Sequence, residues 1–142
     1  MNLYPISAVP SAQSWFMERN PISATSGIKG IVALDDNSKI HGMIVMDTWT
    51  ENSCQVHIAI DTPMVFRCGL LEESFDYIFD FCGRGIVYGI TPANDKRALK
   101  FNQHAGFVEV ARLKDAHEEG VDLIIQEVRK ENYYGQRRSR AA

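Results

Sequence analysis

Three apolar segments joined by very short polar turns dominate the first half of the chain, at residues 28–36, 39–50 and 54–61. The turn between the first two holds residue types that favour tight reversals, namely Asp35, Asp36, Asn37 and Ser38. The third segment alternates between an apolar set and a mixed set, Val56, Ile58 and Ile60 against Gln55, His57, Ala59 and Asp61. Alternate residues of a strand point to opposite faces, and turns this short join neighbouring strands. We therefore expect an antiparallel meander.

Helical periodicity marks two segments on either side of this meander. Residues 11–19 predict a short helix capped by Ser11, and residues 70–82 predict an amphipathic helix that ends at Gly83. Residues 2–8 predict a short first strand interrupted by Pro5.

The second half predicts a strand, a helix and a hairpin. Residues 86–90 form a short apolar run of the kind buried in a sheet, and residues 94–107 predict a basic helix that stops at Gly106. A closing hairpin follows, with strands at 107–113 and 121–128 and a polar turn at 115–120.

The element order is therefore β-α-β-β-β-α-β-α-β-β. This order predicts an α/β fold with a mixed, mostly antiparallel sheet and helices on both faces. We expect residues 1–128 to form a single domain and residues 129–142 to form a basic, flexible tail.

The composition disfavours several classes of function. The chain has 142 residues, 45% apolar and 23% charged, with a formal net charge of −3. These values are typical of one globular domain and not of a nucleic-acid or membrane-surface binder. No apolar run reaches the roughly 18–20 residues of a membrane span, and the N-terminus lacks a secretory pattern. Cys54, Cys68 and Cys82 show no paired spacing, which favours free thiols in the cytoplasm and no metal site.

The sequence ITPANDKRALKFNQHAGFVEVARL at 90–113, followed by GVDLIIQEV at 120–128, resembles the GNAT family of N-acetyltransferases. In that family a helix of this form ends in Gly-Phe, and the phenylalanine opens the next strand. The element order matches over roughly residues 28–128, and short phage- and prophage-encoded members look most similar. The resemblance implies transfer of an acetyl group from acetyl-CoA to an amine, on a small molecule or on a protein.

The resemblance also implies where the coenzyme would bind in the meander half. Pantetheine would pair with the strand backbone at Ile58, Ala59 and Ile60, as an added strand does. The family's glycine-rich phosphate loop corresponds to Arg67, Cys68, Gly69 and Leu70, where a single glycine remains. Glu72 and Glu73 follow directly and add negative charge close to this loop.

The basic helix carries the other implied coenzyme contacts. Its start offers Asn94 or Asp95 at the family's asparagine position, and the family spacing counted back from Gly106 selects Asp95. Three cations could lie near the coenzyme phosphates or form a solvated face: Lys96, Arg97 and Lys100.

The implied acid and base are incomplete. Cys54 stands where some members have a carboxylate base, and Asn102 stands where many have a tyrosine acid. His57 lies on the same strand as Cys54, and a neutral imidazole can take a proton from an ammonium. His57 is therefore the candidate catalytic residue, although a solvated strand histidine is the alternative.

Two other functions remain open from the sequence. The reduced phosphate loop is also expected of a catalytically inactive GNAT-fold protein that serves as an interaction or structural module, for example in a phage particle. An unrelated ligand-binding α/β domain is the third interpretation. The acceptor is not identified, and a second subunit covering the small first-helix layer would make a homodimer or larger assembly.

Overall fold

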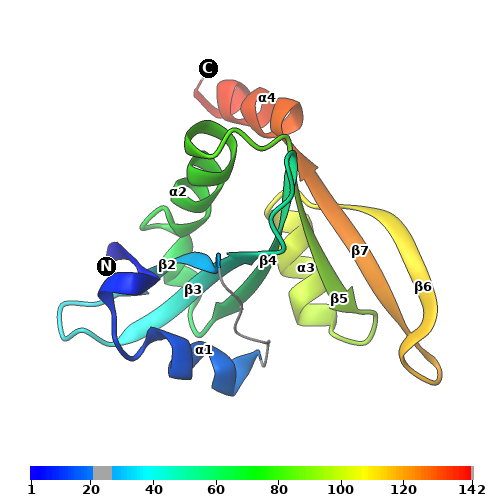
Figure 1. Ribbon diagram of the computed structural model, residues 1–142, viewed down its shortest axis with the longest axis horizontal. Helices are drawn as coiled ribbons and strands as arrows, with labels where there is room; N and C mark the ends of the chain where they lie inside the picture. The colour runs from blue at the N-terminus through cyan, green and yellow to red at the C-terminus, as the bar shows by residue number, and fades with distance from the viewer. Residues whose placement is uncertain (21–26, 142) are drawn as a thin grey trace. The chain divides into compact units, whose positions relative to one another are not determined.

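The computed structural model describes residues 1–20 and 27–141 and divides the chain into two compact units (Figure 1). The first unit comprises residues 1–50 and 54–83, and the second comprises residues 51–53 and 84–142. Each unit is described by itself below.

Four antiparallel strands form the sheet of the first unit, in the order β1-β2-β3-β4. They are β1 (Asn2–Pro5), β2 (Lys29–Leu34), β3 (Ile40–Asp47) and β4 (Ser53–Ile60). The last three are the meander predicted from the alternating segments, which is confirmed. The first strand is shorter than predicted, because the chain turns into a 3-10 helix, η1 (Ile6–Ala8), after Pro5.

The hairpin between β2 and β3 is held by a carboxylate. Asp35 Oδ1 accepts hydrogen bonds from the backbone N–H groups of Asn37 at 2.8 Å and Lys39 at 3.0 Å. Its Oδ2 contacts His41 Nε2 at 2.7 Å. The bond to His41 and these two amides lower the pKa of Asp35 to about 2. The turn predicted from Asp35 to Ser38 is confirmed.

Helices cover both faces of this sheet (Figure 1). On one face lies α1 (Ala12–Arg19), and on the other lies α2 (Leu70–Asp76), reached through the 3-10 helix η2 (Pro63–Phe66). The α2 segment continues into a π-helical turn, η3 (Tyr77–Phe81), before Gly83. Ser11 occupies the N-cap position of α1, as predicted, but its side chain makes no capping hydrogen bond.

The core of the first unit follows the alternation along β3. Met43 and Val45 face α1 and pack with Phe16, while Ile44 and Met46 point to the opposite face, toward α2. On that second face the fully buried side chains of α2 and η3 complete the packing, namely Leu70, Phe75, Ile78 and Phe79.

The second unit contains three antiparallel strands in the order β5-β7-β6. They are β5 (Ile86–Pro92), β6 (Val108–Glu118) and β7 (Val121–Arg129). Helix α3 (Lys96–His104) links the first two, and Gly106 ends it with a φ of +101°, a conformation that glycine adopts without strain. Phe107 is 3% exposed, as the Gly-Phe junction predicted.

The closing hairpin and the C-terminus differ from the sequence prediction. β6 continues to Glu118, so the predicted turn at 115–120 shrinks to its last residues, where Asp115 Oδ1 accepts from the Gly120 N–H at 3.0 Å. β6 is exposed along its whole length, and its pairing with β7 breaks between Glu109 and Ala111 and again between Leu113 and Glu118. Residues predicted as a flexible tail form helix α4 (Lys130–Ala141). The α/β fold class with a mostly antiparallel sheet is confirmed.

Candidate functional site

A histidine and an aspartate are paired on the α1 face of the first unit's sheet. His57 Nε2 on β4 lies 2.9 Å from Oδ1 of Asp47, the last residue of β3. The two side chains are 15% and 11% exposed. The same Oδ1 accepts a hydrogen bond from the Thr48 hydroxyl at 3.2 Å. The histidine predicted as a base is therefore held by a carboxylate.

The pairing determines which ring nitrogen of His57 can act as a base. An ionised carboxylate only accepts hydrogen bonds, so the Nε2 that contacts Asp47 carries the proton of the neutral ring. Nδ1 then keeps its lone pair and can take up a proton. Asp47 would also stabilise the imidazolium that results, because charge-assisted hydrogen bonds are the stronger kind. This is the arrangement of an imidazole general base oriented by a carboxylate.

A cavity of about 380 Å³ lies between α1 and the sheet, on the same face as this pair. We call it the α1-side cavity. It is lined by residues of η1, the segment between η1 and α1, α1, the segment before β2, and β3: Ile6, Ser7, Val9, Pro10, Gln13, Phe16, Met17, Ile28, Met43 and Val45. Val45 is the cross-strand partner of His57. Opposite side chains in an antiparallel pair lie about 4.5–5.5 Å apart at Cβ, so His57 neighbours Val45, one of the residues that line the cavity.

An arginine fixes the helix that covers this cavity. Arg19, the last residue of α1, binds Asp61 through two parallel contacts, Nε to Oδ1 at 3.0 Å and Nη2 to Oδ2 at 2.9 Å. Its guanidinium also stacks 3.7 Å from the centre of the Trp15 ring. The bond from Arg19 lowers the pKa of the Asp61 carboxyl. The C-terminal end of α1 is thus tied to the residue that follows β4.

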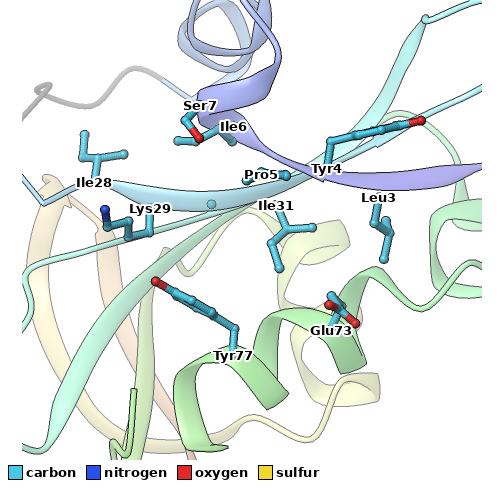
Figure 2. A pocket seen from close by; sticks show the side chains of 11 residues that line it. Leu3, Tyr4, Pro5, Ile6, Ser7, Ile28, Lys29, Ile31, Glu73 and Tyr77 are labelled. Atoms are coloured by element: carbon cyan, nitrogen blue, oxygen red, sulfur yellow. The ribbon is translucent and has the colours of Figure 1, made fainter. Parts of the chain in front are cut away.

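A second cavity, of about 310 Å³, lies on the other face of the same sheet. We call it the α2-side cavity. Figure 2 shows the Tyr77 hydroxyl on the Lys29 side and the Glu73 carboxylate nearer Leu3, with Ile31 between them. Its lining therefore includes ionisable groups, whereas that of the α1-side cavity includes none. It lies across the sheet from His57, and no proton transfer to that ring is expected from it.

The predicted phosphate loop leads directly into α2. Gly69 precedes the helix with a φ of +88°, and no atom lies within 4 Å of the position that a side chain would take. The structure records no side-chain hydrogen bond that caps the start of α2. Arg67 is exposed, and the Cys68 thiol donates to the Val65 carbonyl at 3.1 Å. Leu70 is fully buried and offers only its backbone.

The strand residues predicted to meet pantetheine belong to β4 in the same unit. Ile58 and Ile60 are half-buried and share one face, and Ala59 is 7% exposed and packs in the core under α1. The first unit therefore brings together these three residues, the candidate base and the phosphate loop within one chain segment, 57–70. The coenzyme role of these residues stays a prediction.

The predicted residues of the basic helix lie together at the start of α3, in the second unit. Asp95 is the N-cap, and its Oδ1 accepts a hydrogen bond from the Ala98 N–H at 3.1 Å. The carboxylate at the family's asparagine position is thus used in capping. Asn94, Lys96, Arg97 and Lys100 are exposed. Cations at a helix start oppose the helix dipole, so these side chains do not stabilise α3 through that interaction.

The residues at the family's base and acid positions, Cys54 and Asn102, both lack the chemistry that those roles require. Cys54 is completely buried, so it cannot replace the carboxylate base found at this position in some members. Asn102 Nδ2 donates to Thr91 Oγ1 at 3.1 Å and to Gln126 Oε1 at 3.0 Å. Thr91 and Gln126 are buried. Asn102 therefore ties α3 to β5 and β7, and an amide is no proton donor of the kind a tyrosine provides.

Sequence reasoning missed Asp47, although a signal was present. The segment from Ile40 to Met46 is apolar except for one histidine and one glycine, and Asp47 is the carboxylate that ends it. A charge at the end of a buried strand favours a paired or functional role. What the sequence lacked was the register that sets Asp47 against β4.

Two kinds of feature are absent from the described ranges, 1–20 and 27–141. No helix there is long and apolar enough to cross a membrane. Within the same ranges, no group of three or more histidine, cysteine, aspartate or glutamate side chains is placed to hold a metal ion.

No protein-family model and no curated protein matches the chain, but solved structures do. A single-residue variant of the spermidine N-acetyltransferase SpeG from Vibrio cholerae matches with a TM-score of 0.73 at 15% identity, over 94% of this chain and 97% of that one. The spermidine/spermine N-acetyltransferase SpeG with manganese ions matches with a TM-score of 0.66 at 15% identity, over 92% and 78%.

A dodecameric structure of the Vibrio cholerae spermidine N-acetyltransferase matches with a TM-score of 0.62 at 16% identity, over 89% of this chain and 75% of that one. Identities this low establish the fold and not the reaction. The chain has the fold of these N-acetyltransferases, which is the GNAT fold predicted from its sequence. A phage origin stays a prediction.

Proposed function

We propose that the protein is an N-acetyltransferase that transfers an acetyl group from acetyl-CoA to an amine. The observation that carries the proposal is the His57–Asp47 pair, an oriented base whose cross-strand neighbour, Val45, lines a cavity. The fold shared with spermidine N-acetyltransferases supports the same reaction class.

The residues present fit acetyl-CoA as the co-substrate, which would supply an activated thioester. The open space beside Gly69 would allow a phosphate group to approach the backbone closely. Arg67 would add a charge-assisted bond from its exposed side chain. Glu72 and Glu73 in the first turn of α2 weaken the attraction for an anion, so we expect modest affinity.

His57 and Asp47 would prepare the acceptor for attack. Nδ1 of His57 takes a proton from the acceptor ammonium, directly or through one water, and this frees the lone pair of the nitrogen. Asp47 keeps the ring in the required tautomer and stabilises its charged form. No tyrosine lies on α3, so solvent would supply the proton for the leaving thiolate.

Thermal unfolding with and without about 1 mM acetyl-CoA tests the coenzyme half of the proposal. A ligand at 100 times its Kd adds about 2.7 kcal/mol to the free energy of unfolding, which raises Tm by roughly 6–11 °C for a domain this size. We expect this shift to be lost in Gly69→Val. The matched control is Gly120→Val, because Gly120 also has a positive φ, +84°, with nothing within 4 Å of an added side chain. This control should keep the shift.

An absent shift in the wild type would contradict the proposal. It would favour the alternative, a catalytically inactive GNAT-fold protein that acts as an interaction module. The predicted homodimer or larger assembly and the predicted cytoplasmic location stay predictions under either outcome.

A further inference from the structure

The α1-side cavity has the size and lining of a binding site for an apolar group. Its volume of about 380 Å³ lies within the range of small-molecule pockets, about 300–1,000 Å³. Its floor is formed by the buried side chains of Phe16, Met43 and Val45. Polar groups of the lining, Ser7 and Gln13, are exposed at the rim. An apolar group that enters the cavity would exchange contact with water for contact with apolar side chains. The free energy gained is proportional to the apolar area that is buried.

One carboxylate is placed to meet a cation at the end of this floor. Asp47 lies two residues beyond Val45 on β3 and on the same face, and it holds His57. None of the ten lining residues is ionisable. An ammonium buried without a partner loses several kcal/mol of hydration that nothing in this lining replaces. The site therefore suits a ligand with one ammonium and not a ligand with several.

We propose that the acceptor is a primary monoamine on an apolar body, with the body in the α1-side cavity and the ammonium at His57 and Asp47. This inference rests on the proposed acetyltransferase function and adds the substrate class. The enzymes that share this fold are named for polyamine substrates, and the acceptor proposed here differs from them. Spermidine carries additional ammonium groups, which this cavity would leave unpaired.

The test compares 2-phenylethylamine with spermidine as acceptors, by following release of the coenzyme thiol from acetyl-CoA. We expect kcat/KM for 2-phenylethylamine to exceed that for spermidine by at least about tenfold. Val9→Phe would fill the cavity from the residue that follows η1, and it should lower kcat/KM for 2-phenylethylamine at least about tenfold, mainly through KM. The control, Val108→Phe, makes the same change at a residue 55% exposed on β6 and should leave the value unchanged.

A second variant changes charge without filling space. Gln13→Glu places a carboxylate at the exposed rim, and we expect it to narrow the preference for the monoamine over spermidine. A wild-type preference for spermidine would overturn the inference and leave acetyl transfer intact. Equal rates for Val9→Phe and wild type with 2-phenylethylamine would overturn it as well.

Failure of acetyl transfer itself is distinguished by a binding measurement. If neither amine is acetylated, calorimetric titration of 2-phenylethylamine into the protein without coenzyme tests the cavity alone. Binding that Val9→Phe weakens at least about tenfold, and that Val108→Phe leaves intact, supports the cavity as an amine site. Absence of binding overturns it.

Discussion

Two histidine–aspartate pairs occur in the first unit, and their surroundings differ. His41 lies 2.7 Å from Asp35 at the β2–β3 hairpin, and His57 lies 2.9 Å from Asp47 at the other end of β3. The histidine side chains are similarly enclosed, at 20% and 15% exposure. Asp35, however, also accepts two backbone N–H groups of its turn. Asp47 accepts only one further bond that the structure records among its described residues, from Thr48.

The difference shows that pair geometry alone does not identify a catalytic site. The carboxylate of the hairpin pair is used to build a turn, and its low pKa follows from that turn. The strand-end pair lies beside the α1-side cavity through the register of Val45 with His57. The further bonds of the two carboxylates therefore distinguish the pairs: Asp35 is used to build a turn, whereas Asp47 is left to orient His57.

Replacing each histidine separately tests most directly whether the two pairs have different roles. We expect His57→Gln to lower kcat by about 100-fold, because general-base catalysis contributes about 10²–10⁴ to the rate. We expect His41→Gln to leave kcat within about twofold, since it supports only the hairpin. Steady-state kinetics with saturating acetyl-CoA measures both, and circular dichroism checks folding. Equal losses in the two variants would contradict the assignment of His57.

Changing Asp47 would sharpen the role of the second pair. The amide of Asp47→Asn can donate to Nε2, which favours the ring tautomer with its proton on Nδ1 and blocks the base. We expect kcat to fall at least about tenfold. Ring ¹⁵N chemical shifts of His57 should report the change of tautomer, which a purely structural role would not require. Asp35→Asn is the matched control and should leave these shifts in place.

The Asp35–His41 pair at the hairpin predicts a specific loss of stability at acidic pH. The folded pKa of Asp35 is about 2, below the unfolded value of about 3.9, so its stabilisation is complete above pH 4 and is lost as pH falls toward 2. The Tm difference between wild type and Asp35→Asn should therefore narrow between pH 4 and pH 2. Asp36→Asn, an exposed neighbour, should show no such change. A Tm difference constant down to pH 2 would contradict the role of Asp35.

Much of the fold could be predicted from the sequence, because the spacing of apolar residues and the positions of turn and helix-ending residues indicate the same elements. The three alternating segments of the meander, the stop at Gly106 and the buried Phe107 all follow from local patterns. The errors lie where local patterns are weak. The segment that forms helix α4 shows no regular spacing of apolar residues. Strand β6 extends into residues 115–118, which were predicted as part of a turn because of their residue types. Ser11 has the residue type of a cap without the bond.

The candidate site was only partly predictable. His57 could be selected from its place on a strand, but its partner and the cavity depend on which residues of β3 face it across the sheet. Asp95 was selected from the family spacing, and only the structure shows its carboxylate bonded to Ala98. The partner of His57 depends on tertiary register, which a single sequence does not specify, whereas the Asp95 cap is a local contact within one turn of the helix start.

The irregular pairing of β6 has a consequence for how the protein behaves at high concentration. A long strand at the edge of a sheet is a template on which other extended chains can add, and that is a common start of aggregation. In β6, the two breaks in register interrupt the row of backbone groups; Arg112 places a charge between the breaks, and Lys114 places one within the second. An incoming strand could match only a few hydrogen bonds before it met a bulge. The irregularity would thus help to keep separate molecules in solution.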